Sequence, residues 1–313
     1  MSTFVLRRLL YLAPVWVGIS FLAFVLATLA PGDPARMSAQ ELAGRPPTPV
    51  EIAAERERLG LNAPFPVRYV RWLANAARGD FGLSYRSGQP VTAALLQRLP
   101  STLQLAAAAT LLAMILALPL GVLGAIRRNS PVDHVTRAVA MAGASMPSYW
   151  LAYLLILVFS VRLHWLPVSG RGTWQHLVLP AVALGLGSAA VLMRLTRAEL
   201  LETLNQDYVQ TGRAKGLSEG RVVVGHALRN ALIPVVTMTG IQFGSLLGGA
   251  AIVETVFAWP GIGKFLVDSI SARDYPVIQG FVIVAGTAFL LVNLAVDVAY
   301  AWLDPRIRLA AAS

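Results

Sequence analysis

The sequence predicts an all-α integral membrane protein with six transmembrane helices, both termini in the cytoplasm, and a helical external element between the first two helices. Three observations lead to this fold class. Apolar residues make up 56% of the 313 residues and charged residues only 13%, about half the usual share of roughly 25%. The apolar residues are gathered in long uncharged runs. The basic residues lie mostly between these runs and favour one side of the membrane.

Six of the uncharged or nearly uncharged runs are long enough to cross a hydrocarbon core of roughly 30 Å. The first covers residues 9–30. It exceeds the roughly 7–15 residues of a cleaved signal peptide core, so we expect a transmembrane anchor. The other runs cover residues 101–126, 138–161, 174–193, 231–253 and 276–302.

The orientation follows from the basic residues of the short loops, which concentrate on the cytoplasmic side. One side carries 13 of them, including Arg7, Arg8, Arg127 and Arg128. The short loops of the other side carry four, which are Arg162, Arg171, Lys264 and Arg273. We therefore place both termini in the cytoplasm.

The external element covers residues 31–100. We expect one short helix over 51–61, closed by Gly60, and a second amphipathic helix that carries Val67, Val70 and Leu73 at helical spacing. The chain is thus divided into 1–30 (N-terminus and first span), 31–100 (external element) and 101–313 (transmembrane core with a cytoplasmic loop, 194–230).

Several function classes lack support in the sequence. The net charge of +10 comes without a dense basic run, so no nucleic acid partner is expected. There is no cysteine, no HExxH, no GxSxG and no phosphate-binding GxxxxGK[ST]. His164 and His176 are interpreted as loop histidines. We therefore predict no catalytic residue and no metal site, and the membrane enzyme stays a minor alternative.

An ion-coupled secondary transporter is the main alternative class, because such proteins place ionisable groups within the membrane. Asp297 is the only acidic residue inside a predicted span. We interpret it as a packing group near the inner face.

The cytoplasmic loop 194–230 is the most informative segment. It holds six basic and four acidic residues, and residues 196–210 are good helix formers. Gly216 then predicts a turn, and Ser218 is a plausible N-cap of a following helix. A helix, a glycine turn and a second helix would make a rigid handle for a cytosolic partner, whereas the simpler interpretation is a solvated loop.

This loop contains DYVQTGRAKGLSEGRVVVGHALRNALIPVV from Asp207 onward, which resembles the coupling loop of ABC importer permeases of the dipeptide, oligopeptide and nickel uptake group. Other segments resemble the same group in the same order: LAPGDP, RGDFGLSYRSGQPV, LPSTLQLA, WLPVSGRGTWQHLVLPA, ETVFAWPGIGKFLVDSISARDYPVIQG and LDPRIR. The general loop pattern has Glu-Ala-Ala where this chain has Gln210-Thr211-Gly212.

The resemblance implies a permease subunit in the bacterial inner membrane, surrounded by lipid. Its partners would be a second homologous permease, two cytosolic ABC ATPases and an extracytoplasmic solute-binding protein. ATP and Mg²⁺ would bind to the ATPases, so no cofactor is expected in this chain. The ATPase contact carries over to Asp207, Tyr208, Thr211, Gly212, Ala214, Lys215, Gly216 and Leu217.

The translocation path remains open in the sequence. Gln242, Ser245, Asn293 and Asp297 are candidate lining residues. Gly240, Gly244 and Gly248 allow close helix packing, either within the chain or against a partner. The segment 254–276 could re-enter the membrane or contact the binding protein. The expected solute is a short peptide, with nickel, a nickel chelate or glutathione as alternatives.

Overall fold

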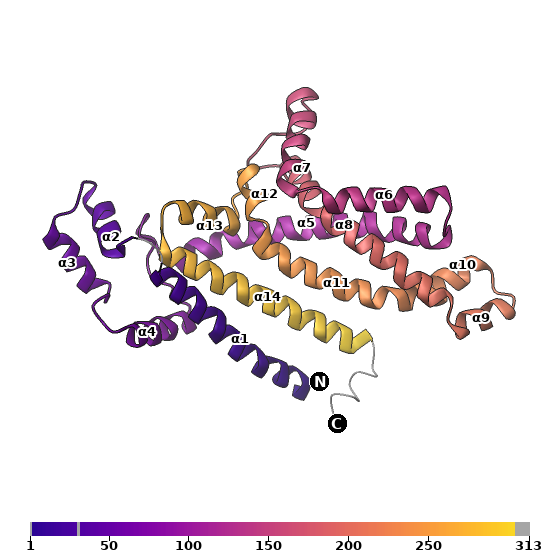
Figure 1. The fold of residues 1–313 in the computed structure, drawn as a ribbon, viewed down its shortest axis with the longest axis horizontal. Coiled ribbons are helices and arrows are strands. Elements are labelled where there is room, and N and C mark those ends of the chain that lie inside the picture. Colours follow the sequence, from indigo (N-terminus) through magenta and orange to yellow (C-terminus); the bar gives the residue numbers. More distant parts are fainter. Residues whose placement is uncertain (1, 30–31, 304–313) are drawn as a thin grey trace. The chain divides into compact units, whose positions relative to one another are not determined.

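The computed structural model describes residues 2–29 and 32–303 of the chain, with the side chains of 13–29 and 32–298 (Figure 1). Within these residues every regular element is a helix, which confirms the all-α prediction. The helices are α1 (Ser2–Leu29), α2 (Pro34–Ala43), α3 (Pro49–Arg58), α4 (Phe65–Ala77), α5 (Val91–Ile126), α6 (Pro131–Ser145), α7 (Ser148–Leu155), η1 (Ile156–Arg162), α8 (Gln175–Leu204), α9 (Asp207–Ala214), α10 (Glu219–Arg221), η2 (Val222–Ala227), α11 (Leu228–Gly249), α12 (Ala251–Val256), α13 (Ile262–Ser271) and α14 (Tyr275–Leu303).

Length and composition make four of the described helical stretches able to cross a membrane alone: Val91–Ile126, Gln175–Leu204, Glu219–Gly249 and Tyr275–Val298. Two bent pairs of helices pass the same test together, so up to six spans are possible. This range includes the expected six without fixing the number.

The third expected span, 138–161, differs most from the prediction. The chain bends by 101° between Pro131–Ser145 and Ser148–Arg162. Met146 is extended, with φ −87° and ψ 119°, because the residue before a proline is pushed out of the helical region by Pro147. An uncharged run predicts apolar helix, but it does not show where the helix bends.

The chain divides into two compact units, which we describe separately. The first unit consists of Met1–Thr102 and Pro260–Ala288, and the second of Leu103–Trp259 and Phe289–Ser313. The expected division into 1–30, 31–100 and 101–313 kept residues 260–288 with the transmembrane core, whereas the contacts group them with the N-terminal part.

The core of the first unit joins α5, α13 and α14. Val91, Leu95, Ile262, Val277 and Phe281 are buried together. A Cβ at Gly280 would lie 2.7 Å from Val91 Cγ1, so the absence of a side chain there allows α14 to approach α5 closely. The external part of this unit has three helices, α2, α3 and α4, rather than the two expected, because Asp33 caps an additional helix at Ala35.

The core of the second unit joins α5, α6, α8 and α11. Small residues let these helices approach closely: Ala113, Ala140, Ala189 and Ala190 are buried in one cluster. A Cβ at Gly185 would lie 2.7 Å from the backbone oxygen of Ala109. Such contacts between small residues are typical of helix packing in membranes.

Candidate functional site

The predicted ATPase contact forms a short helix and a turn in the second unit. α8 ends at Leu204, so the helix expected over 196–210 is interrupted, and Gln206 is extended before α9 begins. α9 carries Asp207, Tyr208, Thr211, Gly212 and Ala214. The turn that follows carries the three remaining predicted residues, Lys215, Gly216 and Leu217. We call residues 207–217 the coupling segment.

The coupling segment is seated on the core rather than extended into solvent. Val209 is 1% exposed and belongs to a buried cluster with Leu200 of α8 and Val222 and Val223 of η2. Leu217 packs against the same cluster from the other end of the segment. The segment is therefore held by one buried residue in its helix and one half-buried residue in its turn.

The turn closes with the hydrogen bonds of a glycine-terminated helix. Gly216 has φ +79°, its N–H donates to the Arg213 oxygen at 2.9 Å, and the Leu217 N–H donates to the Gly212 oxygen at 3.3 Å. This pair of bonds is the Schellman motif. Ser218 occupies the N-cap position of α10 as expected, although its side chain makes no capping bond. The Arg213 guanidinium spans the turn and pairs with Glu219 at 2.6 Å.

The outward face of the segment consists of predicted contact residues. Asp207, Tyr208, Thr211, Ala214, Lys215 and Gly216 are exposed, while Gly212 and Leu217 are half-buried. The Tyr208 side chain is 44% exposed and its hydroxyl accepts a 2.7 Å hydrogen bond from Asn230 Nδ2. The segment thus exposes an acidic, an aromatic and a basic side chain, those of Asp207, Tyr208 and Lys215.

A buried carboxylate that the sequence analysis did not identify braces α8, the helix that precedes the segment. Asp133 of α6 is fully buried, and it accepts bonds from Arg197 Nε at 2.7 Å and Nη2 at 2.8 Å. The Asn129 N–H donates to the same carboxylate at 2.9 Å. Charge-assisted bidentate pairs of this kind combine strength with a defined geometry, so α6 and α8 are joined as one rigid base.

The four candidate path residues lie on two helices of the second unit. Gln242 and Ser245 belong to α11, and Asn293 and Asp297 belong to α14. Ser245 is exposed, and its hydroxyl donates to the Gln242 backbone oxygen. Gln242 Nε2 is buried and has no hydrogen bond partner among the described residues. Asn293 and Asp297 are half-buried. Their role in the path stays a prediction.

A second buried carboxylate organises the part of the first unit that the sequence predicts to be external. Asp274, 2% exposed, accepts hydrogen bonds from the Ser84 hydroxyl, from the Tyr85 N–H at 3.0 Å and from the Arg86 N–H at 3.4 Å. Both partners lie in segments that carry the family resemblance. Their separation of 190 residues gives no spacing signal, so the sequence did not reveal this contact.

The segment 254–276, left undecided by the sequence, is largely helical. It contains the end of α12 and the whole of α13. In the second unit Trp259 is 1% exposed, its N–H donates to the Glu254 oxygen, and its ring lies 5.7 Å from the Arg171 guanidinium. In the first unit the Ile262 N–H donates to Thr102 Oγ1 at 2.9 Å.

Comparison with known proteins gives matches along nearly the whole chain. Residues 117–309 match the family described as binding-protein-dependent transport system inner membrane component, and residues 1–106 match its N-terminal family. The chain is 45% identical over 308 residues to the glutathione transport system permease protein GsiC of Escherichia coli K12, covering 98% of this chain and 99% of the relative. The protein of that name from Shigella dysenteriae serotype 1 shows the same identity and coverage.

Solved structures share the fold. The MetNI methionine ABC transporter in an inward-facing conformation superposes with a TM-score of 0.59 at 21% identity, covering 67% of this chain and 96% of that chain. An amino acid ABC transporter gives a TM-score of 0.53 at 16% identity, with 69% and 94% covered. The family matches and the end-to-end relatives decide the assignment: the chain belongs to the inner-membrane components of binding-protein-dependent transport systems and is a multi-pass permease subunit of an ABC importer in a bacterial inner membrane.

Proposed function

We propose that this chain is the permease subunit of an importer for short peptides, and that glutathione is the first tripeptide to test. The observation that carries the proposal is the 45% identity to a glutathione transport system permease over 98% of this chain and 99% of the relative. A peptide solute also agrees with the nearly uncharged spans, since a path for varied peptides does not need fixed ionic groups to select them.

The assembly follows from the family. A permease of this family works with ATPase subunits and a binding protein. Our finer proposal is a pair of homologous permeases, each docked on a cytosolic ATPase through its coupling segment, with a binding protein delivering solute outside the cell. ATP and Mg²⁺ would bind to the ATPases, and this chain would carry no ATPase site of its own. The exposed face of Asp207, Tyr208 and Lys215 supports the docking role.

Uptake in a strain that lacks this chain tests the solute. Labelled glutathione, a labelled dipeptide and labelled nickel are compared in the deletion strain and in the strain complemented with the wild-type chain. We expect complementation to restore peptide uptake. Restored nickel uptake without peptide uptake would contradict the peptide proposal and favour the nickel branch of the group.

The coupling role is tested by Gly216→Pro. Proline fixes φ near −65° and lacks the N–H, so it cannot adopt the +79° of Gly216 or donate to the Arg213 oxygen. We expect ATP-driven uptake to be lost while the chain still copurifies with its partner permease. The matched control is Gly220→Ala in α10, where φ is not positive and an added Cβ meets nothing within 4 Å. Unchanged uptake in the proline variant would refute the coupling role.

A further inference from the structure

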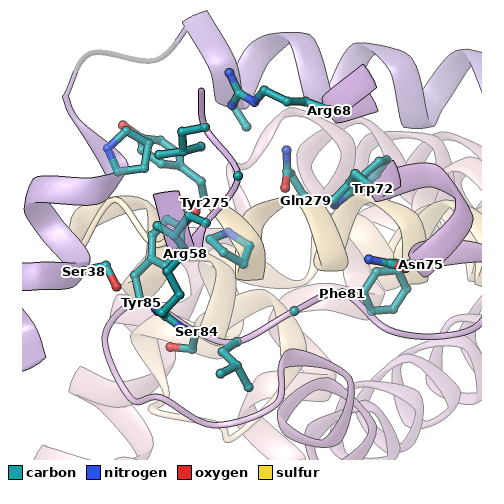
Figure 2. Close-up of a pocket in the computed structure, with 18 of the residues that line it drawn as sticks. Ser38, Arg58, Arg68, Trp72, Asn75, Phe81, Ser84, Tyr85, Tyr275 and Gln279 are labelled. Carbon is teal, nitrogen blue, oxygen red and sulfur yellow. The ribbon is translucent and has the colours of Figure 1, made fainter. Parts of the chain in front are cut away.

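A large cavity lies in the external part of the first unit (Figure 2). Its volume is about 1090 Å³, and its walls come from the end of α1, from α2 and α4, from residues 58–61 and 81–88, and from the start of α14. Cavities of roughly 300–1,000 Å³ hold small-molecule ligands in proteins. This cavity is therefore large enough for a short peptide, and nothing in the coupling mechanism uses it.

The charge on the cavity wall is mostly positive. Four arginines and one acidic residue line it, which are Arg58, Arg68, Arg71, Arg86 and Glu41. Arg58 is neutralised by Glu55, which accepts from its Nε at 2.7 Å. Among the described residues, the other three guanidinium groups have no carboxylate within ion-pair distance. The cavity thus offers three uncompensated cations, which favour a ligand with carboxylates.

A buried amide adds a second and independent feature. Gln279 of α14 is 9% exposed and lines the cavity, and its side chain makes no hydrogen bond within the described part of the chain. Trp72 Nε1, also on the wall, is buried and has no hydrogen bond partner among the described residues, and buried polar atoms without partners are uncommon in folded proteins. An amide side chain can donate and accept at once, which matches the N–H and C=O of a peptide group.

Contacts within the chain hold parts of the cavity wall in place. Arg86 follows Ser84 and Tyr85 on the segment that Asp274 holds. The Trp72 and Phe24 rings pack 5.5 Å apart, centroid to centroid, and the Arg68 guanidinium lies 5.9 Å from the Phe24 ring. Figure 2 shows Arg68, Trp72 and Gln279 among the side chains of the wall. A fixed frame lowers the ordering cost of binding.

We propose that this cavity binds a short peptide that carries more carboxylates than ammonium groups. The carboxylates pair with Arg68, Arg71 and Arg86, the Gln279 amide bonds a peptide group, and Glu41 receives the ammonium group. This proposal rests on the proposed function, peptide import. Within that function, the site would select the solute at the outer side of the membrane. Glutathione, with two carboxylates and one ammonium group, has the required chemistry.

Direct binding tests the site. The complete transporter, assembled in phosphatidylcholine nanodiscs without ATP and without the binding protein, is titrated with labelled glutathione and with triglycine, which has a single carboxylate. We expect glutathione to bind more tightly than triglycine. The double variant Arg68→Gln/Arg71→Gln and the single variant Gln279→Ala should each weaken glutathione binding by about tenfold or more, because each loses hydrogen bonds to the ligand.

The matched control is Arg78→Gln, at the end of α4 and outside the cavity wall, which should bind glutathione as the wild type does. Copurification of the partner subunits verifies that each variant assembles. Equal binding by the cavity variants and the control, or no binding by the wild type, would overturn the proposal. The proposal would also be overturned if phosphatidylglycerol displaced glutathione and copurified with the wild type but not with the arginine variant. The occupant of the cavity would then be a lipid headgroup.

Uptake measured with the same variants separates this proposal from the proposed function. If the wild type takes up peptide but the cavity substitutions do not change glutathione binding, the cavity site is overturned and the import function stands. Arginine-dependent glutathione binding in a transporter that takes up no peptide would support the cavity site and contradict the import function.

Discussion

At the scale of single residues, two buried carboxylates connect segments that are far apart in the sequence. Asp133 binds Arg197 in the second unit, and Asp274 binds the segment of Ser84 and Tyr85 in the first. Burial and the charge of Asp274 raise the pKa of the Tyr85 hydroxyl to about 12, so it stays protonated at neutral pH. In both units a charge is buried where it is hydrogen-bonded from several sides, which keeps its burial tolerable.

Asp274→Asn tests the role of the first-unit carboxylate. The amide keeps the size of the side chain but loses the charge, and its NH₂ group cannot accept from the Ser84 hydroxyl or the backbone. We expect the local opening free energy of residues 84–88 to fall by about 1–3 kcal/mol. Hydrogen exchange of the Tyr85 and Arg86 amides measures this change as an acceleration of roughly 5- to 150-fold.

The matched substitution is Asp268→Asn in α13, whose carboxylate is 44% exposed and pairs with Lys264. A surface pair contributes about 0–1 kcal/mol, so exchange at residues 84–88 should not change. Equal exchange rates in Asp274→Asn and the wild type would show that the carboxylate does not hold the segment.

At the scale of helices, length and apolar content were predictable, and bends and contacts were not. The uncharged runs located both ends of α14 and the start of α8 within one residue, but α8 continues to Leu204, beyond the predicted end at 193, and α5 begins at Val91 rather than at residue 101. The first turns of α5 contain polar residues such as Gln97 and Arg98, so a search for uncharged runs did not include them. The bend after α6 lies at Met146, Pro147 and Ser148. A proline in the sequence does not by itself predict such a bend, because Pro180 and Pro234 lie inside α8 and α11.

The contact between α11 and α14 is tested by glycine substitutions. A Cβ at Gly240 would lie 1.9 Å from Val296 Cγ2, and valine has little freedom to turn away. We expect Gly240→Ala to destabilise the chain by about 1–3 kcal/mol through overpacking. Thermal unfolding of the purified transporter, followed by loss of the monodisperse peak, measures the effect.

Gly248→Ala is the control on the same helix, four residues beyond Gly244, where an added Cβ meets nothing within 4 Å. It should leave the unfolding temperature unchanged or slightly raised, because alanine is the better helix former. A Gly240→Ala variant as stable as the wild type would mean that α11 and α14 do not pack as described.

At the scale of the whole molecule, the sequence predicted the class of protein, whereas the role of residues 207–217 in coupling stays a prediction. The sequence did not predict that residues 260–288 belong with the N-terminal unit, because that grouping depends on contacts of Ile262, Val277 and Phe281 with residues about 170–190 positions earlier in the chain. The cavity arginines were also missed. They are spread over the end of α3, α4 and the 81–88 segment, and only the fold brings them to one wall.

The energy source of the whole transporter gives a further prediction. If ATP hydrolysis by partner subunits drives the cycle, Asp297 does not need to exchange protons. We expect Asp297→Asn to keep most of the wild-type peptide uptake, and an uncoupler that leaves cellular ATP unchanged to have little effect. Complete loss of uptake in a variant that assembles normally would instead favour an ion-coupled mechanism.

The way the coupling segment is fixed has a consequence for how such transporters diversify. Its shape is set by backbone hydrogen bonds at the Gly216 turn and by two inserted side chains, Val209 and Leu217. Among the outward-facing residues, Gly216 forms the turn, the Thr211 hydroxyl donates to the Asp207 oxygen, and Tyr208 accepts from Asn230. The side chains of Asp207 and Lys215 form no part of the buried cluster that seats the segment. If the segment docks an ATPase as we propose, substitutions at Asp207 and Lys215 would change which partner it fits while the fold that seats the segment stays intact.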